Sequence, residues 1–408
     1  KIRDGEYDHQ WPLLRTVWNE VKNPALLCLA GLLHDIGKGY GRGHSKKGGE
    51  IVQQIVERLG FDGAASRIVS FLVLHHLLLT RTSQRRDLGD EKTVIQVAQT
   101  VQDLDLLNML FLLSVADSMA TGPAARSHWK HSLLEELFLK VRKVIREGTF
   151  VTPDATKKAE QKRQKVVKAL EGEFGPKAVE EMLEQVSIRY LLSVELPDMI
   201  QQIRLALGMG DKKYAWALRV RKAPSVTRIL QCTYDIPGLF SKMVGVFTIN
   251  DIRVLSANIF TLRNGLALDI YEVTNPLDPL RESERWDKVH ADILAALEGR
   301  ICLEEMVRIR QKAKEYLKYY ESHIRSKIKI DNQVSDFFTV IEGIWPYRPG
   351  ILYEVARKLH SLELDIRFAK VNIDKEKMAG AFYVRDSAGQ KVFDPEEVAR
   401  MRDLLKEP

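Results

Sequence analysis

Apolar residues recur every three or four positions along the first half of the chain, and this spacing predicts amphipathic helices. The pattern runs from residue 12 to about residue 217, and Gly, Pro or polar residues separate its segments. The predicted helices cover residues 13–21, 25–33, 48–59, 64–79, 92–100, 105–120 and 129–146, with more helices over 153–217. We therefore expect an all-helical domain over residues 1–217, including a C-terminal helical extension.

The pattern changes after about residue 225, where shorter apolar runs are separated by turn residues. A helical segment over residues 235–251 is flanked by predicted strands, and residues 286–298 form a second helix. The predicted strands are 228–234, 252–262 and 265–273, the last following an Asn-Gly turn. This βαββα order is that of the ferredoxin-like βαββαβ arrangement, so the expected fold is an all-α domain followed by α+β domains.

An internal repeat appears when the chain is shifted by 112 residues, the separation of Pro237 and Pro349. The shift places Pro237-Gly238 on Pro349-Gly350 and Ala257 on Ala369. Chance rarely aligns a Pro-Gly pair together with the surrounding apolar pattern. We expect two ferredoxin-like domains, over residues 218–300 and 333–408, joined by a charged connecting helix over 301–332.

Each Pro-Gly pair precedes a predicted helix. Proline fixes one backbone dihedral and glycine permits a positive one, which leaves N–H groups at the helix N-terminus free to hold a ligand carboxylate. Two acids of the first repeat, Asp235 and Asp269, correspond in the second repeat to Tyr347 and Gly380. We expect one good ligand site, at the first turn, and a second site that is weaker or structural.

Three apolar segments of the helical region carry polar residues that need an explanation. His34 and Asp35 end the first segment, His76 follows His75 in the second, and Asp117 interrupts the third. A buried ion pair would explain His34 and Asp35 alone, but a buried carboxylate is costly unless it is paired or bound to metal. One shared metal site explains all three segments, and a divalent ion there would activate water for hydrolysis.

A glycine-rich loop with one lysine follows the His-Asp pair. Lys38 lies among Gly37, Gly39 and Gly41, and His44 closes the loop. A phosphate group could bind there, with Lys38 contacting its oxygens. The alternative is a solvated loop lysine.

The order of these residues resembles the H…HD…D pattern of the HD hydrolase superfamily of helical, metal-dependent hydrolases. The resemblance implies a catalytic site of His34, Asp35 and Lys38, and it implies metal ligands drawn from His34, Asp35, His44, His76 and Asp117. Mn or Mg is the expected metal, with Fe or Zn as alternatives. The family's first His is missing, because Pro12 stands at its place, and His9 is the nearest candidate.

Two arginines follow the second segment, in the stretch HHLLLTRTSQRRDLGD. Arg85 and Arg86 are expected to hold the substrate phosphate or nucleotide together with Lys38. An ion pair with Asp87 or Asp90 is the alternative.

The two repeats resemble tandem ACT domains, which bind amino acids at the interface between two such units. The resemblance implies an effector site that uses the first Pro-Gly turn. The residues expected to bind glutamine are Asp235, Pro237, Gly238, Leu239, Asn250 and Gly350.

The order of an HD domain and two ACT domains resembles the bifunctional uridylyltransferase/uridylyl-removing enzymes, without their nucleotidyltransferase domain. This implies removal of UMP from the uridylylated PII signalling protein under glutamine control, as part of bacterial nitrogen regulation. There are two alternatives: a catalytically inactive HD scaffold with ACT amino-acid sensors, and an HD hydrolase of a free nucleotide such as (p)ppGpp. Because the chain begins with Lys, we expect more sequence before it.

Composition changes this picture little. The 408 residues are 45% hydrophobic and 29% charged, and the net charge of +7 suits an acidic partner without demanding nucleic acid. The three cysteines are too scattered for a disulfide framework, which fits a cytoplasmic protein. We expect no membrane partner, and ACT pairing between chains would produce an oligomer.

Overall fold

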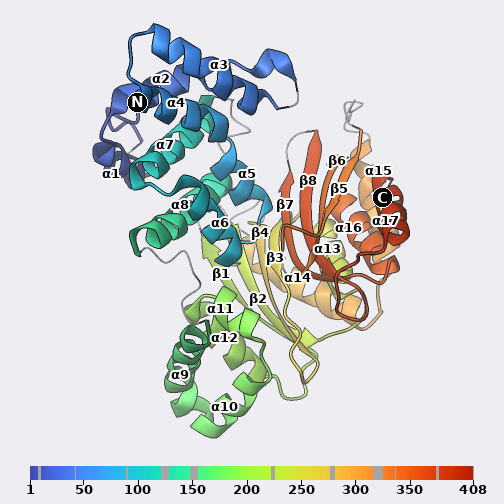
Figure 1. Cartoon of the computed structure of the whole chain (residues 1–408). Coiled ribbons are helices and arrows are strands. Elements are labelled where there is room, and N and C mark those ends of the chain that lie inside the picture. The colour runs from blue at the N-terminus through green and yellow to red at the C-terminus, as the bar shows by residue number, and fades with distance from the viewer. Residues whose placement is uncertain are drawn as a thin grey trace. The chain divides into compact units, whose positions relative to one another are not determined.

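The computed structural model divides the chain into two compact units, residues 1–153 and 154–408, which are described separately (Figure 1). The structure describes residues 1–7, 11–41, 43–88, 91–120, 128–147, 155–221, 226–275, 281–315, 325–335, 337–373 and 376–407. Within these ranges, the structure confirms the expected fold class of a helical region followed by a βαββαβ-type sheet region.

The first unit is a helical bundle, coloured blue to teal in Figure 1. Its most buried helix is α7, in which every residue from Leu107 to Val115 is buried. The other helices pack their apolar faces around it in one core. The described helices are α1 (Pro12–Glu20), α2 (Pro24–Leu33), η1 (Lys38–Tyr40), α3 (His44–Arg58), α4 (Gly63–His75), α5 (Leu78–Arg85), α6 (Glu91–Val101), α7 (Leu104–Ala120) and α8 (His128–Glu147).

One stretch of this unit, Gly63–Arg85, is long and apolar enough to cross a membrane by length and composition alone. A turn at residues 76–77 interrupts it and separates α4 from α5. Its apolar residues Val69, Leu72 and Val73 are fully buried in the core of the bundle. Core helices of globular proteins have the same composition, so this stretch supports no membrane role.

The second unit is built on an eight-stranded sheet in the order β1-β2-β4-β3-β7-β8-β6-β5. In each repeat the edge strand, β1 or β5, comes first in the chain, and the βαββα series follows it. The expected final strand after the second helix is therefore absent from the described residues of each repeat. Neither edge strand was predicted. The strands are β1 (Tyr214–Arg221), β2 (Val226–Tyr234), β3 (Val254–Asn258), β4 (Leu266–Thr274), β5 (Lys327–Asp331), β6 (Thr339–Pro346), β7 (Asp365–Ile373) and β8 (Lys377–Arg385).

The repeat expected from the sequence is present as two halves of this sheet. They join where β3 pairs antiparallel with β7, and Ala257 there pairs directly with Ala369, its partner under the 112-residue shift. Because these two residues are counterparts, the pseudo-twofold axis that relates the halves passes between them. The corresponding helices α13 (Leu239–Ile249) and α16 (Ile351–Ser361) pack against each other.

Helices cover both faces of the sheet in the first repeat. One face shares a core with α13, α14 (Glu282–Leu297), α15 (Leu303–Glu315), α16 and α17 (Pro395–Lys406). The other face, through Leu230, Cys232, Leu268 and Ile270, shares a core with α9 (Ala155–Phe174), α10 (Pro176–Glu184), α11 (Ile188–Ser193) and α12 (Leu196–Leu207).

This packing corrects the expected boundary at residue 217. Helices α9 to α12 were assigned to the first domain because helical spacing continues through them. Their apolar stripes instead pack on strands β2 and β4, and the boundary between compact units falls after Pro153. The connecting helix expected over 301–332 is also shorter, because α15 is described to Glu315 and β5 begins at Lys327.

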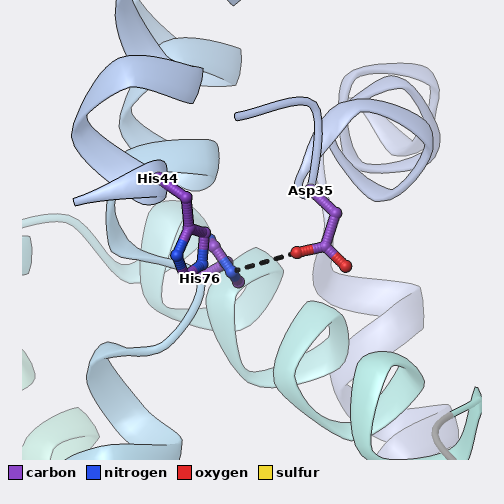
Figure 2. Close-up of side chains that lie close together, drawn as sticks. All are labelled: Asp35, His44 and His76. Atoms are coloured by element: carbon purple, nitrogen blue, oxygen red, sulfur yellow. Dashed lines mark ion pairs between the residues drawn. The ribbon is translucent and has the colours of Figure 1, made fainter. Parts of the chain in front are cut away.

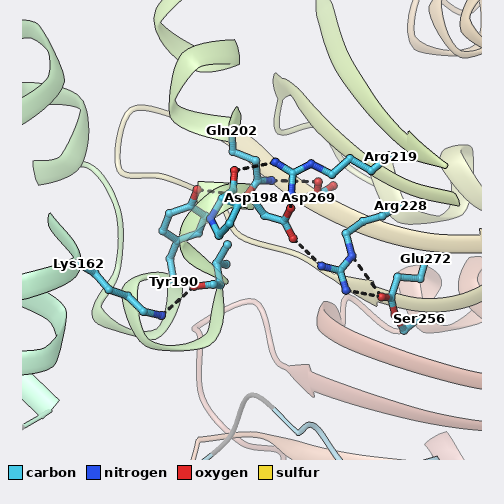
Figure 3. A network of polar contacts seen from close by, with 11 residues as sticks. Lys162, Tyr190, Asp198, Gln202, Arg219, Arg228, Ser256, Asp269 and Glu272 are labelled. Carbon is cyan, nitrogen blue, oxygen red and sulfur yellow. Dashed lines mark hydrogen bonds and ion pairs between the residues drawn. The ribbon is translucent and has the colours of Figure 1, made fainter. Parts of the chain in front are cut away.

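A polar network ties α12 to this face of the sheet (Figure 3). Asp198, in the first turn of α12, is 2% exposed, and its two carboxylate oxygens lie 2.5 Å from Arg219 and 2.6 Å from Arg228. Arg228 also lies 2.6 Å from Glu272 of β4. Burial lowers the pKa of the Arg228 guanidinium, but the charges of Glu272 and Asp198 outweigh burial and raise it. The network therefore holds Arg228 charged.

Candidate functional site

The first unit gathers four of the predicted metal ligands at helix ends and a fifth on α7. His34 and Asp35 follow the last residue of α2, His44 opens α3, and His76 follows α4. Asp117 lies near the end of α7. They form two overlapping groups, and within each group the ligand atoms lie within 4.8 Å of one another. One group is His34, Asp35 and Asp117, and the other, shown in Figure 2, is Asp35, His44 and His76. Asp35 belongs to both groups.

Hydrogen bonds fix the tautomers of two of these histidines. Nδ1 of His34 donates to the backbone oxygen of Gly31 at 2.8 Å, and Nδ1 of His76 donates to that of Val73 at 2.7 Å. Because a carbonyl only accepts, each Nδ1 carries the proton of the neutral ring and each Nε2 keeps its lone pair. Such second bonds orient the histidine ligands of metal sites.

The Nε2 atoms point at carboxylates. His34 Nε2 lies 3.1 Å from Asp35 and 3.5 Å from Asp117, and His76 Nε2 lies 4.0 Å from Asp35. His34 Nε2 is buried without a hydrogen-bond partner in the described chain. A buried lone pair facing two carboxylates is a donor set that fits a divalent metal ion.

Lys38 contacts this cluster from its rim. Its ammonium lies 2.5 Å from Asp35, and its side chain is exposed. Burial raises the pKa of Asp35, but Lys38 and His34 outweigh burial and lower it. Asp35 is therefore ionised at neutral pH, as a metal ligand must be. Burial is also the main reason that the pKa of His76 is lowered, which keeps its ring neutral.

The other residues predicted for this site belong to neither ligand group. His9 and Asp90 fall outside the described residues. Arg85 is exposed at the end of α5, and Arg86 is half-buried next to it. Their expected phosphate contacts stay predictions.

Two further histidines lie near these groups without belonging to them. The ring of His75 packs on Phe71 at a centroid distance of 4.5 Å, outside both ligand groups. His131 of α8 is buried, and its Nε2 lies 3.3 Å from the hydroxyl of Ser118, beside Asp117. Nothing in the local sequence of His131 indicated this position.

In the second unit, a pocket of about 510 Å³ lies between the repeats, next to the first Pro-Gly turn. Gly238 there has φ of +72°, and a Cβ on it would lie 3.1 Å from the ring of His360. Helix α13 starts at this turn without a side-chain cap, so N–H groups of its first turn remain for a ligand. Of the residues expected to bind glutamine, Asp235, Pro237, Gly238 and Leu239 line this pocket.

A second pocket of about 470 Å³ lies at the matching position beside the second turn, and Gly350 lines it. Here Gln311 of α15 donates its amide to the backbone oxygen of Pro349 at 3.0 Å and to Glu354 at 2.7 Å. Asn250 lines neither pocket. Its side chain instead bonds Asp292 and Lys288 of α14.

Asp269 of β4 lies fully buried and also lines the first pocket. It accepts hydrogen bonds from the Gln231 amide at 2.8 Å and from the backbone N–H of Phe260 at 3.4 Å. Burial is the largest influence, and with the nearby charge of Asp235 it raises the pKa of Asp269 to about 7, against the hydrogen bonds.

This raised pKa predicts a pH-dependent stability. Between about pH 4 and pH 7 the folded protein keeps a proton on Asp269 that the unfolded chain releases, so the free energy of unfolding falls as the pH rises, by up to about 4 kcal/mol. In Asp269→Asn, where Gln231 turns its amide to accept, this loss disappears. Urea unfolding of both proteins from pH 4 to pH 8 measures the difference; parallel curves would contradict it.

Comparison with known proteins places this geometry in a family context. Residues 11–110 match the family model of the HD domain. The matched segment contains His34, Asp35, His44 and His76 and ends before Asp117. The matched segment of the first unit is therefore similar to HD domains, which typically bind divalent metals. No solved structure matches the chain significantly.

Several curated proteins are similar along the whole chain. It is 31% identical over 99% of its length to the "Bifunctional uridylyltransferase/uridylyl-removing enzyme" of Gluconobacter oxydans. It is 32% identical over 100% of its length to the protein of that name from Rhodospirillum rubrum, and 33% identical over 99% to that from Novosphingobium aromaticivorans. The chain spans only 43–44% of the length of these relatives.

Proposed function

The chain contains an HD domain and is homologous over its whole length to bifunctional uridylyltransferase/uridylyl-removing enzymes, and from this premise we propose that it removes UMP from a uridylylated PII signalling protein. The observation that carries the proposal is the convergence of five side chains on one partly buried centre in the HD domain: His34, Asp35, His44, His76 and Asp117. The bond to be broken is the phosphodiester between UMP and a tyrosine.

The residues of this centre would have three different roles: metal binding, orientation of the histidine rings and phosphate binding. His34, Asp35 and Asp117 would hold one divalent metal ion, and Asp35, His44 and His76 a second. Bound metal would supply Lewis acidity, activating water and offsetting charge on the phosphoryl oxygens. Gly31 and Val73 hold the rings of His34 and His76 in orientation through their backbone oxygens. Lys38 places a cation at the rim, where it could bind a phosphate oxygen.

The same proposal assigns glutamine to the first pocket between the repeats. Its α-carboxylate would accept from N–H groups at the start of α13, and its ammonium would lie near Asp235. Glutamine would regulate the HD domain only if it prefers one arrangement of the protein over another.

The test is release of UMP from uridylylated PII by this chain with Mn²⁺, with and without glutamine. We expect release that depends on metal, responds to glutamine and is lost in His34→Ala. Glu57→Gln, an exposed charge change on α3, is the matched control and should keep full activity. No release from folded, metal-loaded wild-type chain would contradict the proposal.

A further inference from the structure

The pocket beside the first Pro-Gly turn lies across the seam between the two repeats. Gly238 and Thr261 line it from the first repeat, and His360 and Ile366 line it from the second. At this seam β3 and β7 pair over three residue pairs, whereas β2 and β4 pair over nine. The seam is the least extensive strand pairing in the described sheet, and a ligand in the pocket would contact both of its sides.

A series of polar side chains crosses the seam at the pocket. The hydroxyl of Thr261 donates to Asp235 at 2.8 Å and accepts from Arg367 of β7 at 3.1 Å. The pairing of β7 with β8 shifts register between Ile366 and Phe368, so Arg367 is the extra residue of a β-bulge. Bulges re-aim side chains, which fits the position of Arg367 as a link from β7 to the pocket.

Arg189 of α11, in the set of helices α9 to α12, contacts the same seam. Its guanidinium donates to the backbone oxygen of Ile259 in the first repeat at 3.4 Å and to that of Arg367 in the second at 3.3 Å. The guanidinium carbon also lies 4.8 Å from the ring centroid of Phe260 and 5.2 Å from that of Phe338, one ring from each repeat. One side chain therefore contacts both halves of the sheet, and it reaches the bulged residue that bonds toward the pocket.

Helix α11 is in turn joined to α9 (Figure 3). Lys162 of α9 donates to the backbone oxygens of Leu192 and Val194, at the C-terminal end of α11, at 3.1 and 2.8 Å. Helix α9 is the first described helix of the second unit and begins at Ala155, while the boundary between the units falls after Pro153. A shift of α11 would therefore reach the helix that follows the first unit in the chain.

We propose that Arg189 transmits the state of the effector pocket to helices α9 to α12, and through α9 to the HD domain. The proposal rests on the proposed function, in which glutamine fills this pocket and changes the rate of the HD domain. A ligand that contacts both repeats favours the spacing of the seam in which it makes most contacts. Because Arg189 also contacts both repeats, the position of α11 depends on the same spacing, which couples the two. Arg189 does not line the pocket, so it is a positioning residue that acts on regulation alone.

Three measurements on the whole chain test this role in Arg189→Met, which keeps an unbranched apolar side chain but removes the guanidinium. Calorimetry gives the affinity for glutamine. Release of UMP from uridylylated PII with Mn²⁺ gives the basal rate and the ratio of the rates with and without glutamine. We expect the affinity and the basal rate to stay within about threefold of wild type. The ratio, about fivefold or more in either direction in wild type, should fall below about twofold.

Two further variants complete the series. Arg263→Met makes the same charge change on an exposed arginine of the turn between β3 and β4, whose bond to Gln185 uses its backbone N–H, and it should keep the wild-type ratio. Arg189→Lys keeps the charge and the apolar stem but lacks the planar fork that bonds two carbonyls from above two rings, so its ratio should also fall below about twofold. Arg189→Lys carries the test if Arg189→Met does not fold.

The outcomes separate this inference from the function beneath it. A wild-type chain that binds no glutamine, or binds it without any change in UMP release, would overturn the effector role itself. A folded Arg189 variant with the wild-type ratio would overturn the transmission while leaving the effector role in place. Loss of glutamine binding in that variant would also overturn it, because Arg189 would then act on the pocket and not beyond it.

Discussion

Replacing Asp35 with Asn is expected to lower metal-dependent phosphodiester hydrolysis by about 1,000-fold, because both ligand groups lose the carboxylate that they share. Asn keeps the shape of Asp35 but removes its charge, so the fold should persist. Metal bound per chain, measured by elemental analysis after loading with Mn²⁺, should fall in parallel. Hydrolysis of a chromogenic phosphodiester gives the rate without a protein substrate.

The matched control for Asp35→Asn is Glu57→Gln, which removes one negative charge from the exposed surface of α3. It should keep both the metal and the rate. An Asp35→Asn protein that retained wild-type hydrolysis and metal content would remove Asp35 from the centre, and with it the link between the two ligand groups.

Replacing Asp198 with Ala is expected to cost about 3 kcal/mol in the free energy of unfolding, because it leaves buried positive charge without its partner. Asp198 is almost fully buried and contacts the guanidinium groups of Arg219 and Arg228. Arg228 keeps Glu272, and Arg219 is partly exposed and regains water, which holds the cost below that of a fully buried pair. Urea unfolding of the whole chain measures the change.

An exposed ion pair of the same unit provides the comparison. Lys177 and Glu181 lie 3.9 Å apart on α10, and both are largely exposed. Glu181→Ala should change the free energy of unfolding by no more than about 0.5 kcal/mol. If Asp198→Ala were equally mild, the network in Figure 3 would not stabilise the packing of α12 on the sheet.

The sequence predicted the elements whose apolar periodicity matches their burial. Helix α7 and the βαββα core of each repeat were predicted from the spacing of apolar residues. The pairing of Ala257 with Ala369 agrees with the 112-residue repeat found in the sequence. The edge strands β1 and β5 pair on one side only, and most of their residues are half-exposed or exposed. β5 does alternate Lys and Ile, but its five residues lie at the end of the charged stretch that was predicted as one connecting helix, so the alternation was overlooked.

Long-range packing explains where the prediction was wrong. Helices α9 to α12 have ordinary amphipathic patterns, and a pattern does not say which surface its apolar face will cover. Their assignment to the first domain failed because their partners, Leu230 and Leu268 among them, lie tens of residues later in the chain.

In the candidate site, too, some features were predicted from the sequence and others were not. Unusual polar residues in apolar helices pointed to His34, Asp35, His76 and Asp117, and the structure brings them together with His44. Lys38 contacts Asp35 from three residues away, a spacing at which side chains on a helical turn meet, although the sequence indicated only a phosphate contact for Lys38. Asn250 was expected near the ligand, but its side chain bonds α14 instead.

Anomalous X-ray diffraction from crystals of the chain soaked in Mn²⁺ tests the central claim most directly, because it locates the ions without assuming a substrate. We expect one peak at ligand distance from His34, Asp35 and Asp117 and a second from Asp35, His44 and His76. Crystals with Mn²⁺ bound elsewhere, and no peak at these residues, would contradict a metal centre in this HD domain.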